Sequence, residues 1–188
     1  MKVNIMVSAR HIHLSKEDLF NLFGEDYELT PIKYLNQEPN FSSNEKITIK
    51  YNDKVIENIR VVGPVRDETL LELSKTDCYN LGVEAELVNP FFNIEKKEVL
   101  LIGPNGSIKR KCLVIQNRHM HLNTKEATDL NLKQNDRVKI KIDGVKSGIL
   151  DDVYVRVSDN YHMEVHLDLD DGNAFLIDKK YEGELIYD

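Results

Sequence analysis

Four of the six histidines occur as two closely spaced pairs that could hold metal ions. His11 and His13 form one His-x-His pair, and His119 and His121 form the other. Alternate residues of a β-strand point to the same face, so each pair can present two imidazoles to a common point. Zinc accepts imidazole nitrogens, and a catalytic zinc site uses three protein ligands and leaves one position open. Each pair therefore needs one more ligand from its own half of the chain.

An internal repeat surrounds the two pairs. Residues 5–14 (IMVSARHIHL) match residues 113–122 (LVIQNRHMHL) at an offset of 108 residues. Further along, residues 44–50 match residues 135–141 at an offset of 91, so the first copy carries 17 extra residues (108 − 91), roughly within 27–41. Self-similarity of this kind predicts two related structural units.

The repeat also predicts the third ligand of each pair. Alternating apolar residues at 55–61 match those at 149–155 at an offset of 94, and the same register pairs Glu72 with His166. Both residues follow an apolar strand segment, and both side chains are competent zinc ligands. His162 is matched to an acidic residue of the first half and is not assigned. The predicted sites are therefore His11, His13 and Glu72 in one half, and His119, His121 and His166 in the other.

Other interpretations of these residues compete with metal binding. A lone His-x-His pair is often only a hydrogen-bonded structural feature, and Glu72 could be a solvated carboxylate on a strand. His11 and His13 together with Glu17 also reproduce the HxHxxxE spacing of a cupin. However, no glycine begins the strand before His11, and Glu17 suits the first turn of a helix. The duplication and the matched third position favour two metal sites.

Each half reads as a strand, the histidine pair, a short helix and then several strands. Ser15 and Asn123 are good helix N-cap residues, and each is followed three residues later by an acid that suits the positive helix end. We expect short helices around 16–23 and 124–130. Gly-Pro, Asn-Gly and Asp-Gly turn signals separate β-rich runs elsewhere. The chain is therefore predicted to be mainly β.

We expect two related β-barrel-like domains, with the active site at their interface. The first covers residues 1–90 and contains the insertion near 27–41, and the second covers residues 91–188. The boundary lies somewhere within 89–106, and terminal strands could cross from one domain to the other.

Composition excludes several classes of protein. The chain has 188 residues, of which 41% are hydrophobic and 30% charged, as in an ordinary globular protein. A net charge of −7 argues against nucleic acid as the main partner, so an anionic ligand must meet a local positive site. No stretch approaches the ~18 apolar residues of a membrane span, and no signal peptide is expected. Cys78 and Cys112 lie outside any CxxC motif and are expected to be free, buried thiols.

Three arginines could provide that positive charge. Arg10 and Arg118 each precede a histidine pair, but on a strand they would face away from the histidines, so a structural ion pair explains them at least as well as substrate contact. Arg66 lies six residues before Glu72, just after a Gly-Pro turn, and a loop could bring it to the rim of the metal site. Its guanidinium could hold two phosphate oxygens. From the residues alone, an ordinary surface arginine remains the simpler interpretation of Arg66.

Taken together, these motifs resemble the PduL-type phosphotransacylases, also called phosphate propanoyltransferases. The resemblance covers nearly the whole chain and rests on VSARHIHLS (7–15), GPVR (63–66), ELSKTD (72–77), GPNGS (103–107), RHMH (118–121), EVHLD (164–168) and NA (173–174). It implies a two-barrel fold with two zinc ions, or another divalent metal, held at the domain interface by the six residues listed above. It also implies that Arg66 binds phosphate. The chain departs from the family at TLLELS (69–74) and DDGNA (170–174), which could change the acyl pocket or the coenzyme A contacts.

The implied reaction converts a short-chain acyl-CoA, such as propanoyl-CoA or acetyl-CoA, and phosphate into acyl phosphate and coenzyme A. We expect a homodimer with no nucleic acid or membrane partner. Family members inside bacterial microcompartments often carry an N-terminal extension, whereas the first motif here begins after a few residues. A cytoplasmic enzyme is therefore expected, with association with a microcompartment shell as the alternative. The competing functions are a zinc-dependent hydrolase of acyl-CoA or phosphate esters and a non-catalytic, microcompartment-associated metal-binding protein.

Overall fold

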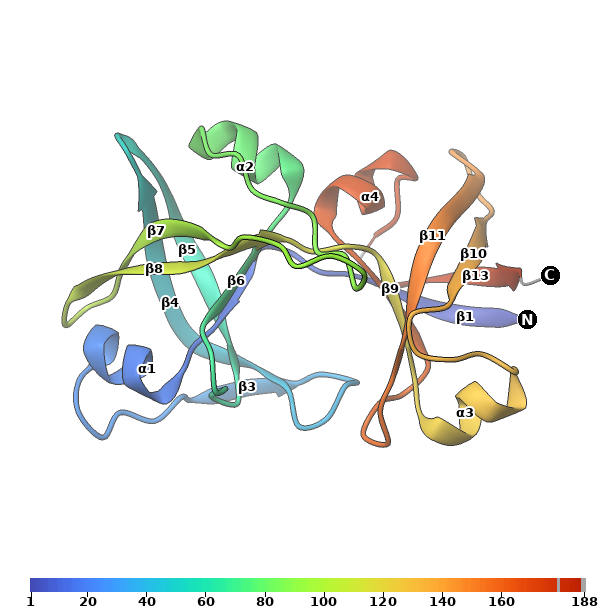
Figure 1. The fold of residues 1–188 in the computed structure, drawn as a ribbon, viewed down its shortest axis with the longest axis horizontal. Helices are drawn as coiled ribbons and strands as arrows, with labels where there is room; N and C mark the ends of the chain where they lie inside the picture. The colour runs from blue at the N-terminus through green and yellow to red at the C-terminus, as the bar shows by residue number, and fades with distance from the viewer. Residues whose placement is uncertain (179, 187–188) are drawn as a thin grey trace. The chain divides into compact units, whose positions relative to one another are not determined.

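The computed structural model describes residues 1–178 and 180–186, and these form two compact units. One unit consists of Arg10–Gln116, and the other consists of Met1–Ala9 together with the described part of Asn117–Asp188. Each unit is built on strands that curve around its own apolar core, with short helices at its edges (Figure 1). The mainly β, two-barrel architecture expected from the repeat is confirmed.

The unit Arg10–Gln116 contains a ring of six strands. Its sheet has the order β3-β4-β5-β2-β6-β8-β7, and an additional pairing between β4 and β7 closes the ring. β3 pairs with β4 and stays outside the ring, and it lies within the 17-residue insertion. The strands are β2 (His11–His13), β3 (Pro31–Tyr34), β4 (Phe41–Tyr51), β5 (Lys54–Gly63), β6 (Leu70–Leu73), β7 (Lys97–Ile102) and β8 (Ser107–Ile115).

The other unit is a closed barrel with the order β1-β12-β9-β11-β10-β13. Its strands are β1 (Lys2–Val7), β9 (His119–Leu122), β10 (Arg137–Ile142), β11 (Gly148–Val157), β12 (Glu164–Leu167) and β13 (Lys180–Ile186). The repeat is preserved strand for strand, since the bounds of β5 and β11 differ by 94 residues at both ends, as do those of β6 and β12.

The two repeats exchange their first strands. β1 opens the first repeat but pairs with β12 and β13, and β8 opens the second repeat but pairs with β6 and β7. The compact units therefore divide the chain after Ala9 and after Gln116, which differs from the expected ranges 1–90 and 91–188. The first division comes directly before the Arg-His-x-His motif that begins at Arg10. The second comes one residue before the motif that begins at Arg118.

Two of the four helices in the described part of the chain were predicted from their N-caps. α1 (Lys16–Phe23) follows Ser15, whose side chain accepts a hydrogen bond from the third helical N–H, and α3 (Thr124–Asp129) follows Asn123 in the same way. These side chains satisfy backbone donors that have no partner within the helix. The predicted ranges 16–23 and 124–130 are confirmed to within one residue.

The other two helices were missed. α2 (Lys75–Leu81) and α4 (Leu169–Ala174) occupy equivalent positions in the repeat, directly after β6 and β12. Their N-caps are Ser74 and Asp168, each with an aspartate three residues later. This spacing is the same capping signature that predicted α1 and α3, so it could have located both helices.

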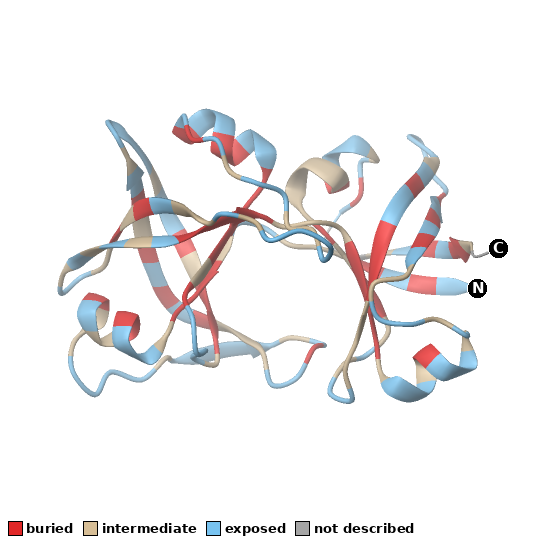
Figure 2. Cartoon of the chain, in the orientation of Figure 1, coloured by how far each residue is buried: buried red, intermediate tan, exposed pale blue. Residues whose placement is uncertain are grey.

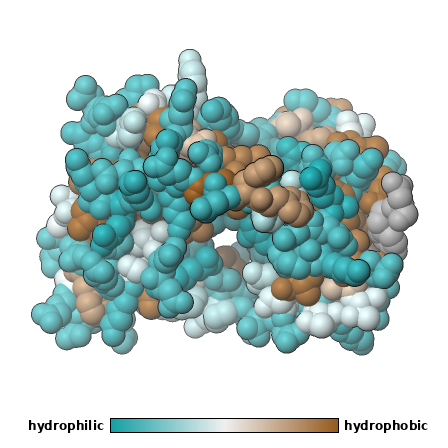
Figure 3. Space-filling model, viewed as in Figure 1, coloured by the Kyte–Doolittle hydropathy of each residue, from teal (hydrophilic) through white to brown (hydrophobic). Residues whose placement is uncertain are grey.

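Each unit buries its own apolar core, as the red segments along the strands of Figure 2 show. Ile12 lies in one core and Met120 in the other, and both are fully buried. Each is the residue between the two histidines of a pair, so the pleat of the strand turns both histidines away from the core. The face shown in Figure 3 is mostly hydrophilic. Among the described residues, no helix combines the length and apolar character needed to cross a membrane.

The two cysteines provide a test of this core packing. Cys78 and Cys112 are free and fully buried, and burial raises the pKa of the Cys112 thiol to about 12. A thiol reagent needs an accessible thiolate. We therefore expect 5,5′-dithiobis(2-nitrobenzoic acid) to label neither cysteine in the native protein and both after denaturation. Rapid labelling of the native protein would contradict the packing described here.

Candidate metal centres

The first centre lies on the unit Arg10–Gln116. β2 pairs with β6 so that His11 is directly opposite Glu72, and His13 lies two residues further on the same face. The Nε2 atom of His11 is 3.4 Å from a carboxylate oxygen of Glu72. One ligand atom from each of the three side chains lies within 4.8 Å of the others. The structure therefore brings together the three residues that the repeat register predicted.

Neighbouring polar groups orient the ligands of this centre. The Nδ1 atom of His13 is 2.8 Å from the backbone carbonyl of Val62, which can only accept a hydrogen bond. Nδ1 therefore carries the proton, and Nε2 keeps the lone pair that a metal needs. The side-chain amide of Gln116 donates to one oxygen of Glu72 at 2.9 Å, whereas the other oxygen faces His11. His13 and Glu72 are thus each held by a contact from outside the group.

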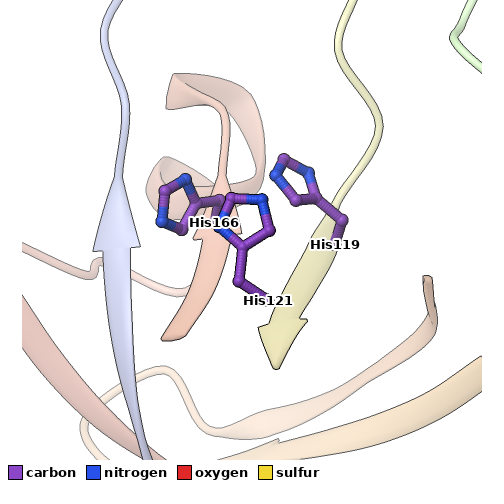
Figure 4. Close-up of side chains that lie close together, drawn as sticks. All are labelled: His119, His121 and His166. Carbon is purple, nitrogen blue, oxygen red and sulfur yellow. The ribbon is translucent and has the colours of Figure 1, made fainter. Parts of the chain in front are cut away.

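The second centre lies on the other unit and consists of three histidines (Figure 4). β9 supplies His119 and His121, and β12 supplies His166, which is directly opposite His119. The centroids of the three rings are 4.5–5.2 Å apart, and one ligand atom from each ring lies within 4.8 Å of the others. The second predicted group is therefore also brought together.

Two histidines of the second centre have hydrogen-bonded outer partners. The Nδ1 atom of His119 donates to the backbone carbonyl of Asn117 at 2.8 Å, as His13 does with its own carbonyl partner. The Nε2 atom of His166 lies 2.9 Å from a carboxylate oxygen of Glu164, a side chain that is only 4% exposed. A carboxylate behind a histidine fixes the ring and raises its basicity as a ligand. The all-histidine centre therefore has a carboxylate of its own, outside the group of three.

Burial keeps His13, His119 and His121 in the neutral form that binds metals. Desolvation is the main cause that lowers the pKa of His13 to about 2, and the charges of His11 and Arg66 lower it further. Desolvation likewise lowers the pKa of His121 to about 2 and holds that of His119 well below its usual value. A neutral imidazole offers a lone pair, whereas an imidazolium does not.

Both groups fit a transition metal, and zinc in particular. Three histidines, or two histidines and a carboxylate, are the ligand sets of catalytic zinc sites that leave one position open. The Nδ1 atom of His121 is buried and has no hydrogen-bond partner in the described part of the chain. This ring therefore has less hydrogen-bonded support than the rings of His119 and His166. Two groups of side chains in this protein can therefore hold a metal ion.

The arginines before the histidine pairs form ion pairs. The Nη1 atom of Arg10 lies 3.0 Å from Oδ1 of Asp77, and the Nη2 atom of Arg118 lies 2.9 Å from Oδ1 of Asp171. The two aspartates are equivalent in the repeat, and each is the third residue of the helix that follows a ligand strand. The ion-pair interpretation of both arginines is confirmed. Each pair ties the start of a histidine strand to a neighbouring helix.

Arg66 lies beside the first centre. Its backbone N–H donates to the carbonyl of Leu14 at 2.9 Å, which holds the loop after β5 against the end of β2. Its guanidinium donates to the side chain of Asn40 at 3.3 Å and is exposed to solvent. The charge of Arg66 also contributes to the low pKa of His13. Arg66 therefore lies close enough to His13 for its charge to act on that ligand.

A glycine shapes the start of this loop. A Cβ atom on Gly63 would lie 2.3 Å from the aromatic ring of Phe41. Real Cβ atoms do not approach other atoms so closely, so only glycine lets Phe41 pack over the end of β5.

Several residues near the centres were not found from the sequence. Arg156 is opposite His121 in the pairing of β9 with β11, and its charge lowers the pKa of both His119 and His121. The repeat matches Arg156 with Val62, so the register carried no signal for it. Gln116 and Glu164 were also missed, although Glu164 stands only two residues before a predicted ligand. His162, which was not assigned, is exposed and belongs to neither group.

Comparison with known proteins gives a consistent result over nearly the whole chain. The family model described as phosphate propanoyltransferase matches residues 4–178. The phosphate propanoyltransferase of Thermotoga maritima is 42% identical over 183 residues, which cover 96% of this chain and 86% of that protein. That of Sebaldella termitidis is 36% identical over 172 residues, covering 90% and 81% of the two chains. That of Alkaliphilus metalliredigens is 34% identical over 187 residues, covering 99% and 88%.

Metal analysis of single-ligand variants tests the two groups. The protein purified with zinc should carry about two zinc ions per chain, one for each three-ligand group. Glu72→Ala and His166→Ala should each reduce the content to about one, because each removes a ligand from a different group. Inductively coupled plasma mass spectrometry measures this ratio. Exposed His162→Ala is the matched control and should retain both ions, whereas equal loss from His162→Ala would contradict the assignment.

Proposed function

This chain belongs to the phosphate propanoyltransferase family, and on that premise we propose that it transfers a short-chain acyl group between coenzyme A and inorganic phosphate with the help of two zinc ions. It is a phosphate acyltransferase by its family. The observation that carries the zinc-dependent part of the proposal is the pair of three-ligand groups, each with a ligand set that leaves a coordination position open. Propanoyl-CoA is the first candidate substrate, and acetyl-CoA is the second.

Zinc bound in such groups would act as a Lewis acid that stabilises negative charge on substrate oxygens. The protein side chains have a complementary task, because both substrates are anionic and the chain has a net charge of −7. Arg66 beside the first centre and Arg156 beside the second provide positive charge where it is needed. Local positive charge of this kind attracts anions in spite of an acidic surface.

We assign phosphate binding to Arg66. A guanidinium holds two phosphate oxygens in a fixed plane, and its hydrogen bonds to an anion are stronger than those between neutral groups. The hydrogen bond that the Arg66 N–H donates to the carbonyl of Leu14 fixes the backbone of Arg66, and the side chain of Asn40 accepts a hydrogen bond from its guanidinium. This support reduces the freedom that the side chain would lose when it binds phosphate. A phosphate held in this way keeps one oxygen directed to the acyl carbon.

The reaction needs no covalent bond to the protein. An oxygen of phosphate attacks the thioester carbonyl carbon and forms the new C–O bond, and negative charge develops on the carbonyl oxygen. When the carbonyl forms again, the C–S bond breaks, and coenzyme A leaves as the thiolate. The products are acyl phosphate and coenzyme A, and the reverse reaction follows the same path. Both cysteines are buried in the core of their unit, which agrees with a reaction that uses no cysteine nucleophile.

Release of coenzyme A from propanoyl-CoA tests the activity and the role of Arg66 together. We expect release that depends on phosphate and gives acyl phosphate, which hydroxylamine traps as the hydroxamate. Loss of hydrogen bonds to a charged group costs about 1.5–3 kcal/mol, so Arg66→Ala should lower kcat/KM for phosphate roughly 10- to 100-fold. Zinc content should stay unchanged. Arg66→Lys should lie between, because it keeps the charge without the planar fork.

The matched control for this experiment is Arg137→Ala, since Arg137 is an exposed arginine paired with Asp152 on a strand of the other unit. It should keep the kinetics of the parent protein. Release of coenzyme A without phosphate would indicate a hydrolase instead. Loss of zinc in proportion to activity in Arg66→Ala would show that Arg66 supports the metal centre rather than the phosphate.

A further inference from the structure

The second centre has one histidine whose ring lacks the usual hydrogen-bonded support. His119 is held by the carbonyl of Asn117, and His166 is held by Glu164. The Nδ1 atom of His121 is buried, and no hydrogen-bond partner for it occurs within residues 1–178 and 180–186. The equivalent residue of the first half, His13, donates from its Nδ1 atom to the carbonyl of Val62. The repeat therefore conserves the ligand but not the contact that orients it.

An aromatic ring takes the place of that contact. The phenol ring of Tyr161 stacks on the imidazole of His121, with the ring centroids 4.1 Å apart and an interplanar angle of 22°. The three rings of the metal group meet one another at larger tilts, between 43° and 54°. A near-parallel neighbour of this kind blocks rotation of the imidazole about its Cβ–Cγ bond, because rotation would drive the ring edge into the phenol face.

The backbone holds Tyr161 firmly in this position. Its N–H donates to the carbonyl of Ser158 at 2.9 Å, and the N–H of Ser158 donates to the carbonyl of Leu122 at 3.1 Å. Leu122 is the residue directly after His121 on β9. In addition, the side chain of Thr124 donates to Asp159 in the same turn. The turn that carries Tyr161 is therefore fastened to the end of the strand that carries His121.

We propose that Tyr161 is a positioning residue for the all-histidine centre. Its ring sets the orientation of His121 and so presents the nitrogen of a neutral imidazole to the zinc ion. This inference rests on the proposed zinc binding. The repeat places exposed Asp67 at the matching position of the first half, so the first centre has no aromatic ring at the position equivalent to Tyr161.

Tyr161 also covers the ring of His121. It is half-buried, whereas His121 beneath it is only 7% exposed. A ligand shielded from water loses less of its metal affinity to competition from solvent, and apolar surroundings of a metal site control solvent access. Removal of the ring would therefore free the imidazole to rotate and expose it to water at the same time.

Zinc affinity measured at the second centre alone tests the proposal. His11→Ala with His13→Ala removes the first centre, and competition with a chromogenic chelator then reports a single zinc ion. Loss of outer contacts typically weakens metal binding 10- to 100-fold, and we expect Tyr161→Ala to bind zinc about tenfold more weakly. Tyr161→Phe keeps the ring and should bind zinc as tightly as the background. Asn160→Ala, at an exposed neighbouring position in the same turn, is the matched control and should do the same.

A spectroscopic measurement separates positioning from general destabilisation. Cobalt(II) in the second centre should show a changed d–d absorption in Tyr161→Ala and an unchanged one in Tyr161→Phe. Tyr161→Ala that keeps the zinc affinity and the cobalt spectrum of the background would overturn the proposal. So would Tyr161→Phe that binds as weakly as Tyr161→Ala, because the hydroxyl and not the ring would then be responsible.

The same variants in the otherwise unchanged chain give a second measurement if the background does not fold. Tyr161→Ala should then lose one zinc ion at a chelator concentration that removes neither from Tyr161→Phe. Equal retention by both variants would overturn the role of Tyr161 and leave the metal centres and the acyl transfer standing. An unmutated protein that binds no zinc would overturn this inference and the zinc-dependent part of the proposed function together.

Discussion

The pleat of two very short strands is the constraint on which both metal centres depend. Ile12 and Met120 are completely buried in their cores, so the histidines on either side of each must face away from those apolar cores. A shift of one residue would turn two imidazoles into the apolar core and turn a core side chain away from it, which makes the register strongly specified. Hydrogen bonding to β6 and β12 then places the third ligands directly opposite His11 and His119. Hydrophobic burial thus determines the geometry of a polar site.

Polar contacts behind the ligands complete this arrangement, and they differ between the two centres. Both contain a carboxylate, but Glu72 belongs to the first group of ligands, whereas Glu164 stands behind a histidine of the second. The first centre has a carbonyl and an amide as outer contacts, and the second has a carbonyl, a carboxylate and an aromatic ring. Two copies of one motif therefore provide two chemically distinct sites, with different charge around the ion.

Local charge reconciles an acidic chain with anionic substrates. Arg10 and Arg118 are committed to aspartates at the first turns of α2 and α4, where they join strand to helix. Arg66 and Arg156 instead act on the histidines through their charge, one in each unit. The arginines that form structural ion pairs therefore differ from those near the metal centres in the strand face or the loop on which they lie.

Local patterns in the sequence determined the histidine pairs, the third ligands, the helices α1 and α3, and the ion-pair interpretation of Arg10 and Arg118. They did so because strand pleat, helix capping and a repeat register act over a few residues or a constant offset. Only the tertiary structure decided which barrel receives β1 and which receives β8, since an apolar strand offers the same hydrogen-bonding edge to either repeat. It also decided the contacts of Gln116, Tyr161 and Arg156. These side chains contact or face the ligands from other strands and turns, and the spacing of residues along the chain does not predict such neighbours.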